Sequence, residues 1–134
     1  MTSVPVPVTL LYGGLNALLI TLLGMNVSRL RGAHGVGIET PVPAELIRPL
    51  RAHGNAIEWV PLGLLLLLVL ELSGAGTRFT LHLCGGTLLL GRALHAAGFL
   101  GKNKLSMVGA ALTYLVLIAM SIWAIAVRFT QYGP

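Results

Sequence analysis

The stretch Arg51–Pro61 reads RAHGNAIEWVP, and it stands directly before the apolar run LGLLLLLVL. Arg51, Asn55 and Glu58 are spaced at i, i+4 and i+7, which places a cation, an amide and a carboxylate on one face of a helix. The apolar run carries no polar group beyond its backbone, so it continues the same helix. A polar stripe is therefore predicted at the mouth of a helix of membrane length.

The composition of the whole chain indicates a membrane protein. Of its 134 residues, 55% are hydrophobic and only 10% are charged, whereas soluble domains carry about 25% charged residues. Apolar segments of about twenty residues or more can cross a hydrocarbon layer of ~30 Å as helices. We expect such spans at about residues 8–28, 50–73, 77–98 and 105–128, within a single domain that covers residues 1–134.

The connections between these spans predict their arrangement. Gly74–Gly76 and Gly101–Lys104 are so short that the helices they join must run antiparallel. The first connection is longer and rich in Gly, Pro and His. Within it we expect Ala44–Arg48 to form a separate short turn at the membrane interface, with the second span beginning near Pro49. The predicted fold is all-α, an up-down-up-down four-helix bundle in a membrane.

The distribution of charge predicts the orientation. The first and third connections, with the adjoining helix ends, hold most of the cations, namely Arg29, Arg31, Arg48, Arg51, Lys102 and Lys104. The opposite side holds only Arg78 and Arg128. By the positive-inside rule we expect the first and third loops in the cytoplasm and both termini across the membrane, as in a multi-pass protein of a bacterial inner membrane. No cationic region of a signal peptide precedes the first span.

The same charge bias accounts for the net charge of +5, so we expect no nucleic acid as a partner. Cys84 is the only cysteine, which excludes an intrachain disulfide. No histidine has ligand spacing, and we expect no metal site. Glu71 and His82 are expected near the opposite membrane face, at the interface or in contact with each other. Small residues such as Gly85 and Gly109 are expected to allow close helix approach.

Antiparallel spans bring a second polar stripe to the level of the first. Asn55 and Glu58 lie roughly 6 and 10 Å beyond Arg51 at ~1.5 Å per residue, and Arg92 and His95 occupy the last turns of the third span. Charges at this depth cost about 2.5–3.5 kcal/mol each unless they face a partner or a cavity. One alternative is a Glu58–Arg92 ion pair that only fixes helix register. The excess of cations favours a pocket for an anionic ligand whose ammonium group meets Glu58.

These motifs resemble a known family. The pattern Arg51-Ala-His-x-Asn55-x-x-Glu58-x-x-Pro61, followed by Gly91-Arg92-x-x-His95 and Phe99-Leu-Gly-Lys102, is similar to that of the MAPEG family, the membrane-associated proteins in eicosanoid and glutathione metabolism. Microsomal glutathione transferases, prostaglandin E synthase and leukotriene-forming synthases belong to it. The resemblance extends over essentially the whole chain.

The resemblance implies a homotrimer that binds glutathione, as co-substrate, between neighbouring subunits near the cytoplasmic face. The other implied partners are membrane lipid and a lipophilic electrophile or lipid from the bilayer. The glutathione-binding residues that it implies are Arg51, Asn55, Glu58, Arg92, His95, Arg48, Arg29 and Phe99.

Two departures from the family pattern concern the thiol of glutathione. Phe99 stands where family members often have a tyrosine, and the start of the fourth span lacks the arginine that stabilises the thiolate. The catalytic group therefore stays unassigned, with Arg29, Lys104 and Ser106 as candidates.

Three functions follow from these patterns. The first is a membrane glutathione transferase, with or without peroxidase activity, that detoxifies lipophilic electrophiles. The second is a non-catalytic lipid-binding scaffold of the same fold. The third, a proton-coupled exporter that uses Glu58, is disfavoured because no continuous polar path leads on to Glu71.

Overall fold

The chain folds into four long helices. The computed structural model describes residues 6–131 and 133, and contains α1 (Pro7–Ala33), α2 (Ala44–Leu72), α3 (Arg78–Gly101) and α4 (Leu105–Gln131). Each helix is long and apolar enough to cross a membrane. The described residues form no strand. The all-helical prediction with four membrane-length helices is therefore confirmed.

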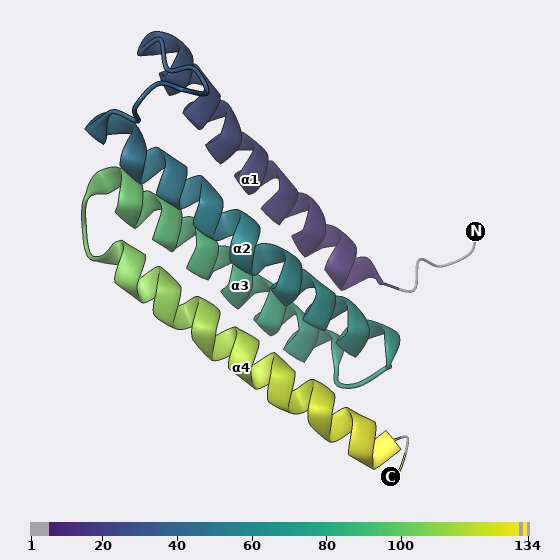
Figure 1. Cartoon of the computed structure of the whole chain (residues 1–134). Coiled ribbons are helices and arrows are strands. Elements are labelled where there is room, and N and C mark those ends of the chain that lie inside the picture. The colour runs from purple at the N-terminus through teal and green to yellow at the C-terminus, as the bar shows by residue number, and fades with distance from the viewer. Residues whose placement is uncertain (1–5, 132, 134) are drawn as a thin grey trace.

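The helices alternate in direction, but they do not form a closed bundle. Figure 1 shows α2 and α3 side by side, with α1 and α4 on opposite sides of this pair. Over the described residues α1 packs on α2 and α3 and makes no contact with α4. The start of α1 and the end of α4 lie at the same end of the molecule, as an up-down-up-down topology requires. The side of α2 that lies between α1 and α4 is therefore left partly uncovered.

The start of α2 differs from the prediction. The helix begins at Ala44, with Pro43 as its N-cap, and continues through Pro49 and Pro61 to Leu72. The expectation of a separate turn at Ala44–Arg48 is therefore wrong. Pro49 removes only one backbone donor, and it does so in the second turn, where water can satisfy the carbonyl that is left without a partner.

The other helices also extend beyond the apolar spans, and their ends are locally determined. α1 continues to Ala33 and α4 to Gln131. Thr77 begins α3 with a capping box, because its side chain accepts from the backbone N–H of Thr80 while the Thr80 hydroxyl accepts from Thr77 N–H. The helices are thus longer than the hydrocarbon layer requires.

Glycines bring α3 and α4 into close contact. A Cβ atom added at Gly109 would collide with the backbone of His95, and one added at Gly98 would collide with the backbone of Ser106. A third glycine, Gly85, makes room for the ring of Tyr12 from α1. The prediction that small residues allow close approach is confirmed for Gly85 and Gly109. The α3–α4 contact presses the polar end of α3 against the start of α4.

Substitution of Gly109 tests this contact. Gly109→Ala is expected to lower the free energy of unfolding by about 1–3 kcal/mol, because the backbone atoms that the new methyl group meets cannot move aside as a side chain would. Thermal unfolding of detergent-purified protein, followed by circular dichroism, measures the effect. Gly14→Ala is the matched control, because no atom lies within 4 Å of its added Cβ. Equal stability of the two variants would contradict the close contact.

Candidate functional site

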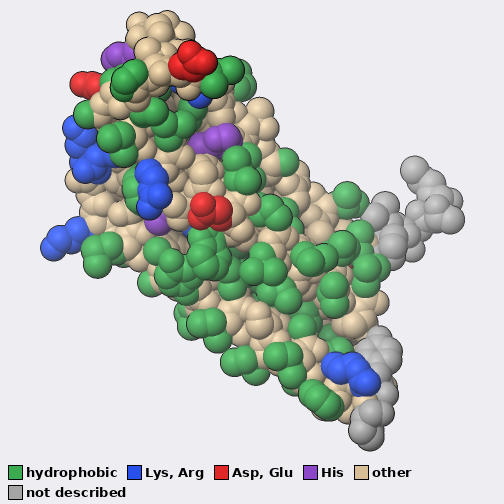
Figure 2. All heavy atoms as spheres, in the orientation of Figure 1, with side chains coloured by type: hydrophobic (Ala, Val, Ile, Leu, Met, Phe, Trp, Pro, Cys, Tyr) green, Lys and Arg blue, Asp and Glu red, His purple; other side chains and the backbone are tan. Residues whose placement is uncertain are grey.

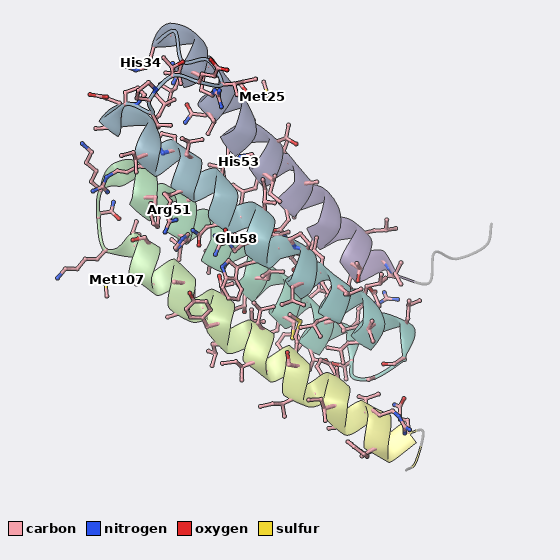
Figure 3. The ribbon with its side chains drawn as sticks, in the orientation of Figure 1. Met25, His34, Arg51, His53, Glu58 and Met107 are labelled. Atoms are coloured by element: carbon pink, nitrogen blue, oxygen red, sulfur yellow. The ribbon has the colours of Figure 1, made fainter. Side chains whose placement is uncertain are left out.

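The polar stripe of α2 lies on the outer side of the protomer. Ala52, Ala56 and Val60 on the inner side of the helix are buried, whereas Arg51 and Glu58 are exposed. Figure 3 labels Arg51 and Glu58 on α2, two turns apart along the helix. Asn55, between them, is half-buried. The α2 stripe, Arg51, Asn55 and Glu58, therefore presents its three functional groups to whatever lies against this side of the helix.

Arg92 lies behind this stripe, inside the protomer. Its side chain is only 2% exposed, although it belongs to α3, a membrane-length helix. Its Nη1 donates to Thr113 Oγ1 of α4 over 3.5 Å, at the long end of hydrogen-bond distances. Its Nε and Nη2 have no hydrogen-bond partner among the described residues. A buried guanidinium with unsatisfied donors lowers stability, and it leaves these two nitrogens free to donate to a ligand.

His95 is held in one orientation by α4. Its Nδ1 lies 2.8 Å from the backbone carbonyl oxygen of Ser106, and its ring packs on that of Phe99 with centroids 4.9 Å apart. Because a carbonyl oxygen only accepts, Nδ1 carries the proton and Nε2 of a neutral ring holds a lone pair. Nε2 is buried and has no hydrogen-bond partner in the described part of the chain. The imidazole is therefore fixed against the start of α4.

The register-fixing ion pair between Glu58 and Arg92 does not form. The side-chain hydrogen bond of Arg92 goes to Thr113, and the carboxylate of Glu58 stays exposed on the outer side of α2. The two residues come from adjacent packed helices, but Glu58 is exposed whereas Arg92 is buried. The carboxylate is thus available to a ligand or to another chain.

The remaining predicted residues are spread around the same end of the molecule. Arg48 lines a cavity of about 300 Å³ between the start of α2 and the end of α3, together with Glu45 and Lys102. Arg29 donates from Nη2 to Asn26 Oδ1 within α1, over 3.0 Å. Lys104 is exposed in the turn between α3 and α4. Figure 2 shows basic side chains gathered at this end, above a surface that is mostly hydrophobic.

The opposite end of the molecule has its own polar contacts, which the sequence did not predict. The carboxylate of Glu71 accepts from the backbone N–H groups of Val8 and Thr9, over 2.8 and 2.7 Å, and so caps the start of α1. His82 contacts the hydroxyl of Tyr12 over 3.3 Å. Glu71 and His82 therefore meet α1 rather than each other. Because the Glu71 carboxylate is engaged as a cap, it is poorly suited to accept a proton passed on from Glu58.

The interhelical cap could not be read from the chain because its partners are 62 and 63 residues apart. One local feature points to a missing cap. Val6, the N-cap of α1, makes no side-chain hydrogen bond to the first backbone N–H groups of the helix, so these groups need a partner from elsewhere.

The four membrane-length helices, one of which carries the α2 stripe, indicate a multi-pass membrane protein. The model of the MAPEG family matches residues 9–126, and the chain belongs to this family. It is also similar to the inner membrane protein YecN of Escherichia coli strain K12, with 40% identity over 92 residues, which covers 69% of this chain and 70% of the relative. YecN of E. coli strain CFT073 matches to the same extent. The four apolar helices and these relatives support a multi-pass inner-membrane protein.

Replacement of Arg92 tests whether its burial serves stability. Arg92→Met keeps an unbranched side chain that fills part of the space of Arg92 and removes the unsatisfied donors, so the free energy of unfolding is expected to rise by about 1–3 kcal/mol. Thermal unfolding in detergent measures the change. Thr113→Val, which removes the contact of Arg92 on α4, is expected to lower stability. A loss of stability in Arg92→Met would show that the guanidinium has a structural role.

Proposed function

We propose that this protein is a glutathione-dependent membrane enzyme that conjugates or reduces lipophilic electrophiles. The observation that carries the proposal is the α2 stripe. Its two charged residues are exposed on a membrane-length helix, in a chain that belongs to the MAPEG family. Exposed charges in a membrane-length helix require a polar ligand, water or a partner chain. Glutathione belongs to the family's chemistry, and its groups match the stripe.

The match is one of charge and hydrogen bonding. Glutathione carries two carboxylates, one ammonium group and a thiol on a peptide backbone. Glu58 accepts from the ammonium group, Arg51 binds a carboxylate, and the Asn55 amide pairs with a peptide group. Arg48, on the next turn of α2 toward its start, supplies a second cation for the other carboxylate. Loops one and three, which carry these cations, face the cytoplasm in this proposal.

The stripe is completed by other copies of the chain. A lipid-exposed charge at membrane depth costs about 2.5–3.5 kcal/mol, and the open side between α1 and α4 leaves Glu58 without cover from its own protomer. A neighbouring subunit that covers α2 would close the glutathione site and could bring its own Arg29 to it. We propose a homotrimer, and a native mass of three chains in mild detergent tests it.

The proposed chemistry is attack by the glutathione thiolate. The sulfur forms a bond to an electrophilic carbon and displaces a leaving group, or it attacks the distal oxygen of a lipid hydroperoxide and releases the alcohol. In the second case a second glutathione thiol resolves the sulfenic acid to the disulfide and water. The electrophile arrives from the bilayer. Arg29 and Lys104 are the candidate cations that stabilise the thiolate, whereas the Ser106 hydroxyl donates to the backbone carbonyl oxygen of Asn103.

One observation favours a lipid-binding scaffold as the second candidate function. Phe99 offers no hydroxyl to a thiol, and Arg92 and His95 both hydrogen-bond to α4 rather than toward the α2 stripe. In a scaffold, glutathione binds to the stripe but its thiol stays protonated. The two functions therefore share a binding site and differ in the state of the sulfur.

Substitutions in the α2 stripe test glutathione binding. Arg51→Ala and Glu58→Ala are each expected to weaken binding roughly tenfold to a hundredfold, because each removes a charge-assisted hydrogen bond of about 1.5–3 kcal/mol. Isothermal titration of detergent-purified protein with glutathione measures the affinity. Arg78→Ala is the control, because this exposed cation lies at the other end of the molecule. Equal losses in all three variants would rule out the stripe as the site.

A further inference from the structure

A second hollow lies at the opposite end of the molecule from the α2 stripe. It is a groove of about 370 Å³ between the last turns of α2 and the last turns of α4. The residues that line it are Val69, Leu70, Leu72, Ser73, Ala124, Val127 and Arg128. We call it the α2–α4 groove. It shares no residue with the proposed glutathione site.

The groove is aliphatic along most of its length. Leu70 and Val127 form part of the buried core, and Val69 and Leu72 are exposed beside them. Ala124 is the smallest side chain in the α4 wall, and its size leaves part of the space open. Both walls belong to membrane-length helices. This aliphatic part of the lining suits a hydrocarbon chain.

Arg128 gives the groove one charged end. It lies in the last turn of α4, where a span leaves the hydrocarbon and long cationic side chains reach the interface. One of its five N–H donors goes to the backbone oxygen of Gly133. The Ser73 hydroxyl at the same end donates to Leu70 O and accepts from Ala75 N–H, so it is already engaged within its turn. The guanidinium is therefore the group at this end that is suited to a phosphate.

We propose that the α2–α4 groove binds a phospholipid, with one acyl chain along the aliphatic lining and the phosphate of the headgroup on Arg128. The groove and the cation complement the two parts of one molecule, which neither would do alone. Since the groove offers a cation and no carboxylate, a headgroup with net negative charge binds better than a zwitterionic one. This lipid site lies at the end of the molecule where α1 begins and α4 ends.

Native mass spectrometry tests the proposal on the full chain in mild non-ionic detergent. The probes are phosphatidylglycerol and phosphatidylethanolamine of identical acyl chains, each titrated into the protein. We expect saturable binding of phosphatidylglycerol, with an affinity about fivefold above that for phosphatidylethanolamine, the ratio that one basic residue gives at an anionic lipid surface.

Two pairs of variants separate the cation from the groove. Arg128→Gln is expected to bring the two lipids to equal affinity, whereas Arg78→Gln, at the same end but outside the groove, retains the preference. Ala124→Leu fills the groove and is expected to remove saturable binding of both lipids. Ala126→Leu adds the same bulk to an exposed position of α4 that does not line the groove, and it is expected to bind as the wild type does.

Three results would overturn the proposal. The first is equal binding of the two lipids by the wild type, and the second is retention of saturable binding by Ala124→Leu. The third is a change in the number of chains per particle in Ala124→Leu but not in Ala126→Leu, which the same spectra report. That third result would assign the groove to contact between copies of the chain.

Discussion

A charged or polar group at membrane depth must be satisfied by something other than lipid, and the arrangement of this protein depends on that constraint. The chain meets it differently at different positions. Glu71 is satisfied within the chain, by the first backbone donors of α1. Arg92 is enclosed between helices with one long hydrogen bond, and Arg51 and Glu58 are left on the outer side of α2. Arg51, Glu58 and the unsatisfied donors of Arg92 all lie toward one end of the molecule, which is why the proposed site is placed there.

The glycines of α3 and α4 determine how closely that end is packed. Gly98 and Gly109 let the two helices approach until backbone meets backbone, and this contact sets His95 against the carbonyl oxygen of Ser106. α1 lies on the other side of the α2–α3 pair and does not reach α4. Because α1 and α4 do not meet, one side of α2 is left open, and the proposed glutathione site and the proposed neighbouring subunit are both placed there.

The helices and the α2 stripe could be predicted from the sequence because both depend on short-range patterns. Apolar runs of membrane length give the spans, and the spacing of Arg51, Asn55 and Glu58 puts them on one side of a helix whatever its neighbours do. The start of α2 was harder to predict, because Pro49 indicates a break although its missing donor lies in the second turn, near the start of the helix. Counting residues along the helices placed Glu58 and Arg92 at the same height in the bundle. This count does not give the rotation of α3 about its own axis. That rotation turns Arg92 toward Thr113. The Glu71 cap depends on contacts between distant parts of the chain, which no local pattern encodes.

The most direct test of the proposed activity is the ultraviolet difference absorbance of the glutathione thiolate. Detergent-purified protein is mixed with glutathione at neutral pH, where a free thiol is mostly protonated. An enzyme of the proposed kind gives a thiolate signal that saturates with glutathione and disappears in Arg51→Ala. Saturable binding of glutathione with no thiolate signal would contradict the enzymatic function and leave a protein that binds the tripeptide without activating it.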